Sequence, residues 1–321
     1  MTETIAQAAP APVDAVLRDE LAHGDAMIGT IAPILRHLLN NDEHSVFGDD
    51  ILAAMRGMMA DVATQLLDAR NEATGEADCG EHEPAQIAAL VEHFVVHPGF
   101  LGHVHALALE SQLAGRLQAR LAIDPVLSPL LQALIASSEA HIAGSAMALL
   151  AAQARFVQQQ RRMQLPLSEL PGDLLHTALI ALRGQAGDDP GRLSQVAAGE
   201  HKIRSAFDEG RSRLGLIARI VSGMGGGATV ALSVTHAGIA IFLSALAIAS
   251  GQDRDMAVLA TNESQVARLA LALRASGLKQ QAIEEQFESL HPEISLPPNF
   301  ELLGADHAAA LLARSAAYPG G

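Results

Sequence analysis

Residues 222–252, which contain no Asp, Glu, Lys or Arg, dominate the hydrophobic pattern of the chain. A glycine-rich segment opens this run, Gly251 lies at its end, and one polar ring, His236, lies near its middle. A helix that is apolar on every side is typical of a helix covered all round by its neighbours. We therefore expect residues 229–249 to form the central helix of an all-helical domain, with His236 as a buried polar group.

Two other interpretations fit this stretch less well. About 22 uncharged residues are long enough to cross a bilayer, but many of them are Ala, Ser, Thr or Gly. His236 would also lie near the membrane midplane. Residues 223–228 superficially match a dinucleotide-binding fingerprint, but the acidic residue required about 20 positions later is missing. A membrane span and a nucleotide site are therefore not expected.

Helical periodicity, interrupted by glycine and proline, continues through the rest of the chain. Residues 263–275 carry an apolar stripe and are expected to cover the central helix. The pattern predicts an all-α fold, with an N-terminal helical bundle followed by a HEAT-like array of short helix pairs around one apolar central helix. The expected organisation is a disordered leader (1–12), an N-terminal helical domain (13–163), a proline-bearing linker (164–173) and a C-terminal helical array (174–321).

The composition agrees with packed helices and narrows the function classes. Hydrophobic residues make up 49% of the 321 residues, but aromatic residues only 3%, so alanine and leucine fill the core. The net charge of −15 argues against a nucleic-acid-binding surface, which needs clustered Lys and Arg. A single cysteine, Cys79, excludes an intramolecular disulfide, and the N-terminus lacks a signal-peptide pattern. These features predict a cytoplasmic protein.

Two segments resemble a known family. They are residues 149–182, beginning LLAAQARF, and residues 241–278, beginning IFLSALAI. Both are similar to a bacterial family of uncharacterised all-helical, HEAT-like proteins of unknown function. The resemblance covers the second half of the chain and implies an all-helical scaffold, without a catalytic motif to transfer.

Histidines are densest in residues 79–110. His93 and His97 stand four positions apart, so they would share one helix face and could both ligate a divalent metal. His103 and His105 follow a proline-glycine turn, close enough to fold back over the same site. The spacing is not HExxH, because no carboxylate lies between the first two imidazoles to act as a base. These four are the candidate ligands for zinc or another divalent metal; the alternative is ordinary histidines on partly exposed helix faces.

A second candidate is His141, which follows Glu139 in a helical segment. Phosphotransfer helices present a histidine beside an acidic residue in this way. No nucleotide-binding domain follows, so His141 could only relay phosphate from a partner. The alternative is a solvated or hydrogen-bonded helix histidine.

Two charged segments carry no specific chemistry in the sequence. Residues 200–213 alternate in sign, and pairs such as Glu209 and Arg213 stand four positions apart, as on a solvated helix face. Asp253-Arg254-Asp255 is typical of a helix start, where carboxylates favour the helix dipole.

The combined pattern favours a non-enzymatic helical protein–protein interaction or regulatory adaptor module that acts on a protein partner. No nucleophile elbow, P-loop or pair of catalytic carboxylates can be recognised. The alternatives are a metal-dependent enzyme that uses the four histidines and a histidine phosphotransfer protein that uses His141. A homodimer is compatible with the pattern. A resident cofactor, a nucleic-acid partner and a membrane are not expected.

Overall fold

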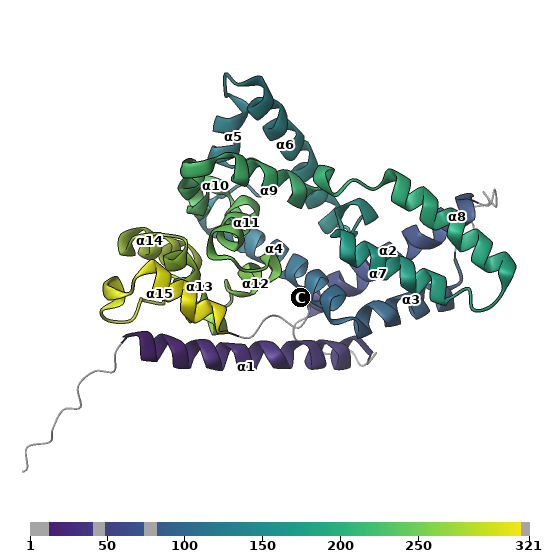
Figure 1. The fold of residues 1–321 in the computed structure, drawn as a ribbon, viewed down its shortest axis with the longest axis horizontal. Coiled ribbons are helices and arrows are strands. Elements are labelled where there is room, and N and C mark those ends of the chain that lie inside the picture. Colours follow the sequence, from purple (N-terminus) through teal and green to yellow (C-terminus); the bar gives the residue numbers. More distant parts are fainter. Residues whose placement is uncertain (1–12, 41–48, 74–81, 316–321) are drawn as a thin grey trace, which may run out of the picture.

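The computed structural model describes residues 13–40, 49–73 and 82–315, and within these ranges every regular element is a helix (Figure 1). The α-helices are α1 (Val13–Asn40), α2 (Asp49–Ala73), α3 (Pro84–Val96), α4 (Pro98–Leu121), α5 (Pro129–Ile135), α6 (Ala140–Gln160), α7 (Gly172–Gly184), α8 (Pro190–Ala206), α9 (Arg213–Gly223), α10 (Val234–Ala237), α11 (Ile239–Ser250), α12 (Arg254–Leu259), α13 (Val266–Ala275), α14 (Gln280–Leu290) and α15 (Ala305–Ala313). The 3-10 helices are η1 (Leu167–Glu169), η2 (Glu209–Arg211), η3 (Gly225–Leu232), η4 (Glu263–Gln265) and η5 (Phe300–Leu302). The all-α prediction is confirmed, and no repeat array is identified in these ranges. The predicted leader, residues 1–12, lies outside them.

Two large hydrophobic clusters form the interior. One packs the C-terminal half of α4 against α5, α6, α9 and the helices from α11 to α15. The other packs the N-terminal half of α4 against α2, α3, α7 and α8. The two clusters correspond to the left and right parts of the molecule in Figure 1, with α4 passing between them. Each cluster takes residues from both sides of the predicted linker.

The predicted linker, residues 164–173, is fixed to α2. The Leu165 N–H donates to Asp61 Oδ2 at 3.0 Å, and Gln65 Nε2 donates to the Leu165 carbonyl oxygen at 3.0 Å. The Leu167 N–H donates to Gln65 Oε1 at 3.0 Å. The division into two domains at this segment stays a prediction.

The sequence predicts one helix over residues 229–249, but the structure divides this apolar stretch. It forms η3, the single turn α10 and then α11. Gly238 separates the last two with a φ of 73°, a conformation that favours glycine, and a Cβ there would lie 3.0 Å from the Cβ of Ser128. His236 lies on α10 and is only partly buried, so its prediction as a buried group is wrong.

The central-helix prediction holds for α11. Every residue from Ile239 to Ala247 is buried, and α13 packs against it as the stripe on residues 263–275 predicted. Ile248, also expected to be buried, is 49% exposed. Among the described helices, none alone has both the length and the apolar character of a membrane span. Helices α3 and α4 meet those criteria only when taken together, across a bend of 94°.

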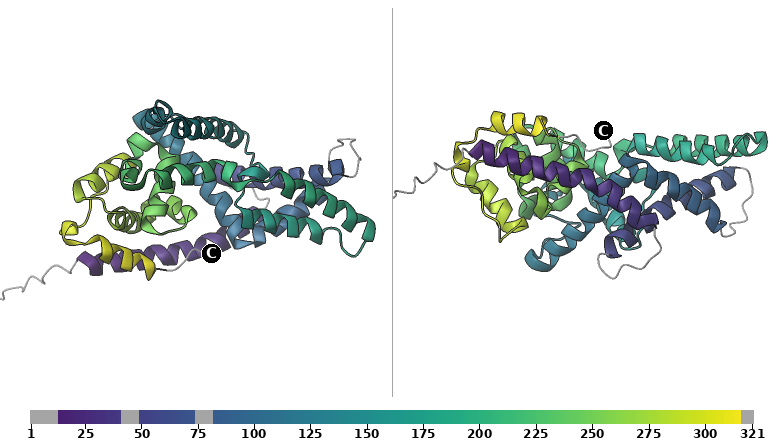
Figure 2. Two further views of the ribbon diagram at one scale, coloured as in Figure 1. Left: turned by 45° about the horizontal axis from the view of Figure 1, so that its top comes forward. Right: turned by 90° about the horizontal axis from the view of Figure 1, so that it is seen from below.

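Helix α1 runs along both clusters (Figure 2). Its buried residues Leu17 and Leu21 join the cluster around α11, whereas Leu35 joins the cluster around α2. Between these, the Gly24 carbonyl oxygen accepts a hydrogen bond of 2.7 Å from Gln265 Nε2. The next residue, Asp25, forms an ion pair with Arg268 of α13. This one helix therefore connects the two halves of the interior.

Candidate functional site

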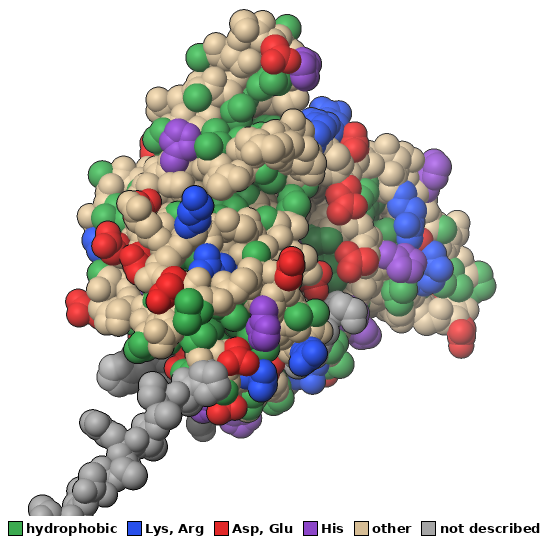
Figure 3. Space-filling view, turned by 60° about the vertical axis from the view of Figure 1, so that its left-hand side comes forward, with side chains coloured by type: hydrophobic (Ala, Val, Ile, Leu, Met, Phe, Trp, Pro, Cys, Tyr) green, Lys and Arg blue, Asp and Glu red, His purple; other side chains and the backbone are tan. Residues whose placement is uncertain are grey.

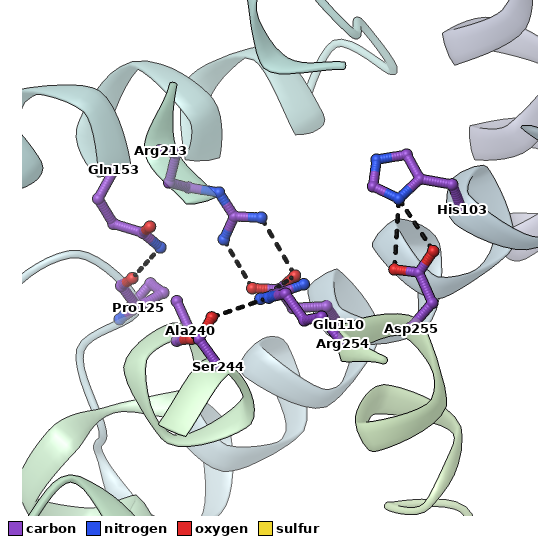
Figure 4. Close-up of polar contacts among 9 residues, drawn as sticks. All are labelled: His103, Glu110, Pro125, Gln153, Arg213, Ala240, Ser244, Arg254 and Asp255. Atoms are coloured by element: carbon purple, nitrogen blue, oxygen red, sulfur yellow. Dashed lines mark hydrogen bonds and ion pairs between the residues drawn. The ribbon is translucent and has the colours of Figure 1, made fainter. Parts of the chain in front are cut away.

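A buried ionic network lies where α4, α9 and α12 meet (Figure 4). Glu110 of α4 accepts two hydrogen bonds from Arg213, of 2.7 Å from Nη1 and 3.2 Å from Nη2. Arg254 Nη2 lies 2.9 Å from Glu110 Oε2, and Arg254 Nε donates to Ser244 Oγ of α11 at 3.0 Å. Glu110 and Arg213 are 4% and 1% exposed. One carboxylate is therefore shared by two arginines in the interior.

Arg213 is held at the start of α9 by its local sequence. Ser212 caps the helix, because its Oγ accepts from the Gly215 N–H at 3.1 Å. A Cβ at Gly215 would collide with the Glu209 carbonyl oxygen, so the close approach of η2 to α9 requires glycine. The Arg213 guanidinium lies 3.8 Å from the centre of the Phe156 ring on α6, within cation–π range.

The charge state of Glu110 bears on what the site can do. Burial alone would raise its pKa, but the attraction of Arg213 and Arg254 outweighs burial and lowers the pKa to about 2. Glu110 therefore stays ionised near neutral pH and remains engaged by both arginines. A general acid needs a pKa closer to the working pH, so this carboxylate is suited to structure and charge rather than proton transfer.

A second polar pair lies beside the network. His103 Nδ1 is 3.0 Å from Asp255 Oδ2, and His103 is 2% exposed. Burial would raise the pKa of Asp255, but His103 and Arg254 lower it overall. His105 is also buried, and burial lowers its pKa to about 4, although the charge of Asp255 opposes this. His105 is therefore neutral at neutral pH.

A cavity of about 190 Å³ opens next to Glu110 and Arg213, between α4 and α6. We call it the α4–α6 groove. Positions 110, 111, 114, 115 and 118 form one face of α4, and positions 153, 156, 157, 160 and 161 form the facing side of α6. The groove is lined by Glu110, Ser111, Ala114, Gly115, Gln118, Pro125, Gln153, Phe156, Val157, Gln160, Arg161, Arg213 and Ile239. It therefore combines apolar walls with a few polar groups, as ligand sites do.

Gln153 has a fixed orientation in the wall of this groove. Its Nε2 donates to the Pro125 carbonyl oxygen at 2.9 Å (Figure 4). Its Oε1 is buried without a hydrogen-bond partner. The amide therefore anchors the loop before α5 to α6 and keeps the groove wall in place.

The four candidate metal ligands do not form one site. His93 is exposed on α3, with Nδ1 2.8 Å from the Ala89 carbonyl oxygen. His97 ends α3 with extended backbone and caps α4, its Nδ1 accepting from the Phe100 N–H at 3.1 Å. His103 and His105 are buried in α4. In the part of the chain that the structure describes, no group of three or more His, Cys, Asp or Glu residues is arranged to hold a metal ion.

His141 lies in the first turn of α6 and faces solvent. Its side chain is 79% exposed, and its Nε2 is 3.8 Å from Glu139 Oε2. The predicted neighbour is therefore present, in a weak and solvated pair. A role in phosphotransfer stays a prediction.

Sequence reasoning missed the network itself. Arg213 was expected on a solvated face paired with Glu209, but it is buried and bound to Glu110, which lies 103 positions away. The sequence pattern predicts only an ordinary helix start around Arg254. The sequence contains one weak signal: cations are scarce, 21 Lys and Arg against 36 Asp and Glu, and Arg213 stands next to apolar residues.

Comparisons with protein families, curated proteins and solved structures find no match to this chain. The resemblance of residues 149–182 and 241–278 to a HEAT-like family stays a prediction. The interpretation of the site therefore depends on its own geometry.

The neutral His105 predicts loss of stability in acid. Its pKa is lower in the folded chain, about 4, than the ordinary 6.5, so the unfolded chain takes up the proton first. His105 therefore costs no free energy of unfolding above pH 6.5. Between pH 6.5 and pH 4 the free energy of unfolding falls as the pH falls, by at most about 1.4 kcal/mol per pH unit for one group. A His105→Asn variant should show a shallower decline than the parent protein in urea unfolding series between pH 5 and 7.

The control for this experiment is His141→Asn, because His141 is exposed. This variant should keep the decline of the parent protein. His291, whose pKa is also lowered by burial, adds a loss that persists in both variants. An unchanged slope in His105→Asn would contradict the prediction.

Proposed function

We propose that the protein is a non-enzymatic helical interaction module, and that the α4–α6 groove binds a short helical segment of a partner protein. The observation that carries this proposal is the pair of facing helix surfaces with an open cavity between them. An amphipathic helix recognises a groove of this kind by inserting apolar side chains at helical spacing. A cavity of about 190 Å³ suits one such side chain.

The walls and floor of the groove support an apolar anchor. Val157 supplies accessible apolar surface, the buried Phe156 and Ile239 complete the packed wall, and Ala114 with Gly115 keeps the α4 side open. Below them, Arg213 and Glu110 are fixed by their own hydrogen bonds. A preorganised site loses little conformational entropy when it binds, which favours affinity.

The charges of the groove specify the partner further. Glu110 is the one carboxylate among the lining residues, and two arginines already engage it. Arg161, at the end of α6, is exposed beside the groove. We therefore expect an Asp or Glu in the bound segment within one helical turn of its apolar anchor. Acidic and basic side chains are interspersed on the face seen in Figure 3, so charge on that face provides no competing single-sign patch.

The same proposal includes the finer features expected from the sequence. The short helices after α9 would act as a HEAT-like scaffold, and the protein would work in the cytoplasm on a protein partner. The groups nearest the groove support a binding role rather than catalysis, because Glu110 and Arg213 are already paired with each other. The metal-enzyme and phosphotransfer alternatives stay predictions.

The test fills the groove without disturbing the fold. Gly115 lies on α4 in the groove, and a Cβ added there meets no atom within 4 Å. A leucine at this position should occupy the space of the anchor and slightly favour the helix. Gly29 on α1 offers a matched control, because it is also exposed with no atom within 4 Å of an added Cβ.

Peptides selected from a random displayed library on the parent protein are then titrated by fluorescence anisotropy. We expect Gly29→Leu to bind them as the parent does and Gly115→Leu to bind them at least about tenfold more weakly, a loss of about 1.4 kcal/mol. Arg161→Glu should weaken the binding of those peptides that carry the acidic residue. If Gly115→Leu binds the selected peptides as tightly as the parent protein does, the proposal is contradicted. It is also contradicted if the leucine displaces a small molecule from the groove but leaves peptide binding unchanged.

A further inference from the structure

A second cavity, of about 530 Å³, lies in the other half of the molecule, and no proposal above uses it. We call it the α3–α8 pocket. It is formed by α2, α3, the end of α7 with the following turn, and the start of α8. Its volume is within the range of small-molecule sites, whereas the α4–α6 groove is smaller. The two cavities share no lining residue.

The side chains around the α3–α8 pocket have an unusual balance of charge for this chain. The protein has 36 acidic and 21 basic residues, yet none of the lining residues is Asp or Glu. Arg70, His93 and Arg192 line it together with Gln86, Gln185 and Gln195. A concave site with one sign of charge raises the local concentration of the opposite ion. This balance favours an anionic ligand.

Arg192 is the cation best placed to contact such a ligand. It lies in the first turn of α8, and its side chain is 69% exposed. Its nearest carboxylate is Asp189 Oδ2, 4.0 Å from Nε, and an exposed pair at that distance contributes little stability. Asp189 Oδ1 instead caps α8 by accepting from the backbone N–H groups of Gly191 and Arg192. The guanidinium can therefore exchange this weak pair for a ligand.

The other two basic residues are already engaged by neighbouring groups. His93 Nδ1 is 2.8 Å from the Ala89 carbonyl oxygen, so Nδ1 donates to that carbonyl, and Nε2 can donate to an oxyanion only when the ring carries a second proton. Arg70 Nε donates to Asn71 Oδ1 at 3.0 Å. No ligand contact is therefore placed on Arg70.

We propose that the α3–α8 pocket binds a small organic anion, one that carries a phosphate or carboxylate group on an apolar body. The oxyanion would be held by Arg192, with His93 beside it. Ala85 and Ala89 supply accessible apolar surface for the body of the molecule, whereas Leu182 and Val196, 0% and 2% exposed, are part of the packed wall. The apolar surface distinguishes this site from a site for an inorganic ion alone.

The test compares matched pairs of charged and uncharged probes by calorimetric titration of the full chain. The pairs are adenosine monophosphate with adenosine and benzoate with benzyl alcohol, and inorganic phosphate is titrated as well. We expect at least one organic anion to bind, with its uncharged counterpart at least about tenfold weaker and inorganic phosphate weaker than the organic anion. The two pairs distinguish phosphate from carboxylate as the preferred group.

Arg192→Gln should lower the affinity for the anion that binds by at least about tenfold, because a charge-assisted hydrogen bond is lost. The matched control is Arg204→Gln on the same helix, since Arg204 is exposed and does not line the pocket. It should bind as the parent protein does. Equal affinity for both members of each pair, or unchanged binding by Arg192→Gln, would overturn the proposal. Peptide binding at the α4–α6 groove should be the same in all these variants.

Discussion

A Leu243→Asp variant is expected not to fold, whereas Ile248→Asp on the same helix is expected to fold normally. Leu243 is 0% exposed in the centre of α11, and the residues around it belong to the larger hydrophobic cluster. The aspartate would be buried without a partner, a cost that consumes much of the stability of about 5–15 kcal/mol that domains have. Ile248 is 49% exposed, so a charge there remains in water.

The measurement is far-UV circular dichroism with size-exclusion chromatography on both variants. We expect Ile248→Asp to give the same helical signal and elution volume as the parent protein. We expect Leu243→Asp to lose the helical signal and to elute at a different volume. A folded Leu243→Asp protein of normal stability would mean that α11 is not the covered centre of this cluster.

The second large effect is expected at Glu110. Glu110→Gln keeps the shape of the side chain but removes the charge, and it leaves Arg213 and Arg254 without their shared carboxylate. Breaking a buried pair from one side costs about 3–5 kcal/mol, because the remaining charge is desolvated and unpaired. The free energy of unfolding, measured by urea titration at pH 7, should fall by that amount.

Two comparisons make this result specific. Glu72→Gln removes the carboxylate of an exposed pair with Lys202 and should change the free energy of unfolding by less than about 1 kcal/mol. The double variant Glu110→Leu with Arg213→Met replaces two partners by apolar groups and should recover part of the loss. An effect at Glu110 no larger than at Glu72 would contradict the buried network.

Much of the fold follows from local pattern. The apolar stripe of α13 and the covered position of α11 each depend on residues close together in the sequence. Local periodicity identifies such elements because a helix repeats its environment every few residues. The length of α11 was harder to predict. Gly238 could be accommodated in a buried helix, but here its φ of 73° ends α10, and a Cβ at this position would crowd Ser128 of another segment.

The candidate site depends on long-range contacts, which local pattern does not contain. Glu110 and Arg213 are 103 positions apart, and His103 and Asp255 are 152 apart. Either member of each pair is compatible with a solvated helix surface when its neighbours alone are considered. The four-residue spacing of His93 and His97 suggested a shared face, but the chain turns at His97, which caps the next helix.

The position of α1 has a consequence for how the chain folds during synthesis. The hydrogen bond from Gln265 to Gly24 and the ion pair between Arg268 and Asp25 span 241 and 243 positions. At about 5–20 residues per second, the ribosome takes on the order of tens of seconds to make that intervening chain. The N-terminal half of α1 therefore waits for these two partners on η4 and α13, whereas its C-terminal half can pack on α2 early, through Leu35. Until then Leu17 and Leu21 lack the part of their cluster that follows α9, so the N-terminal half of α1 is a segment that molecular chaperones should recognise during synthesis.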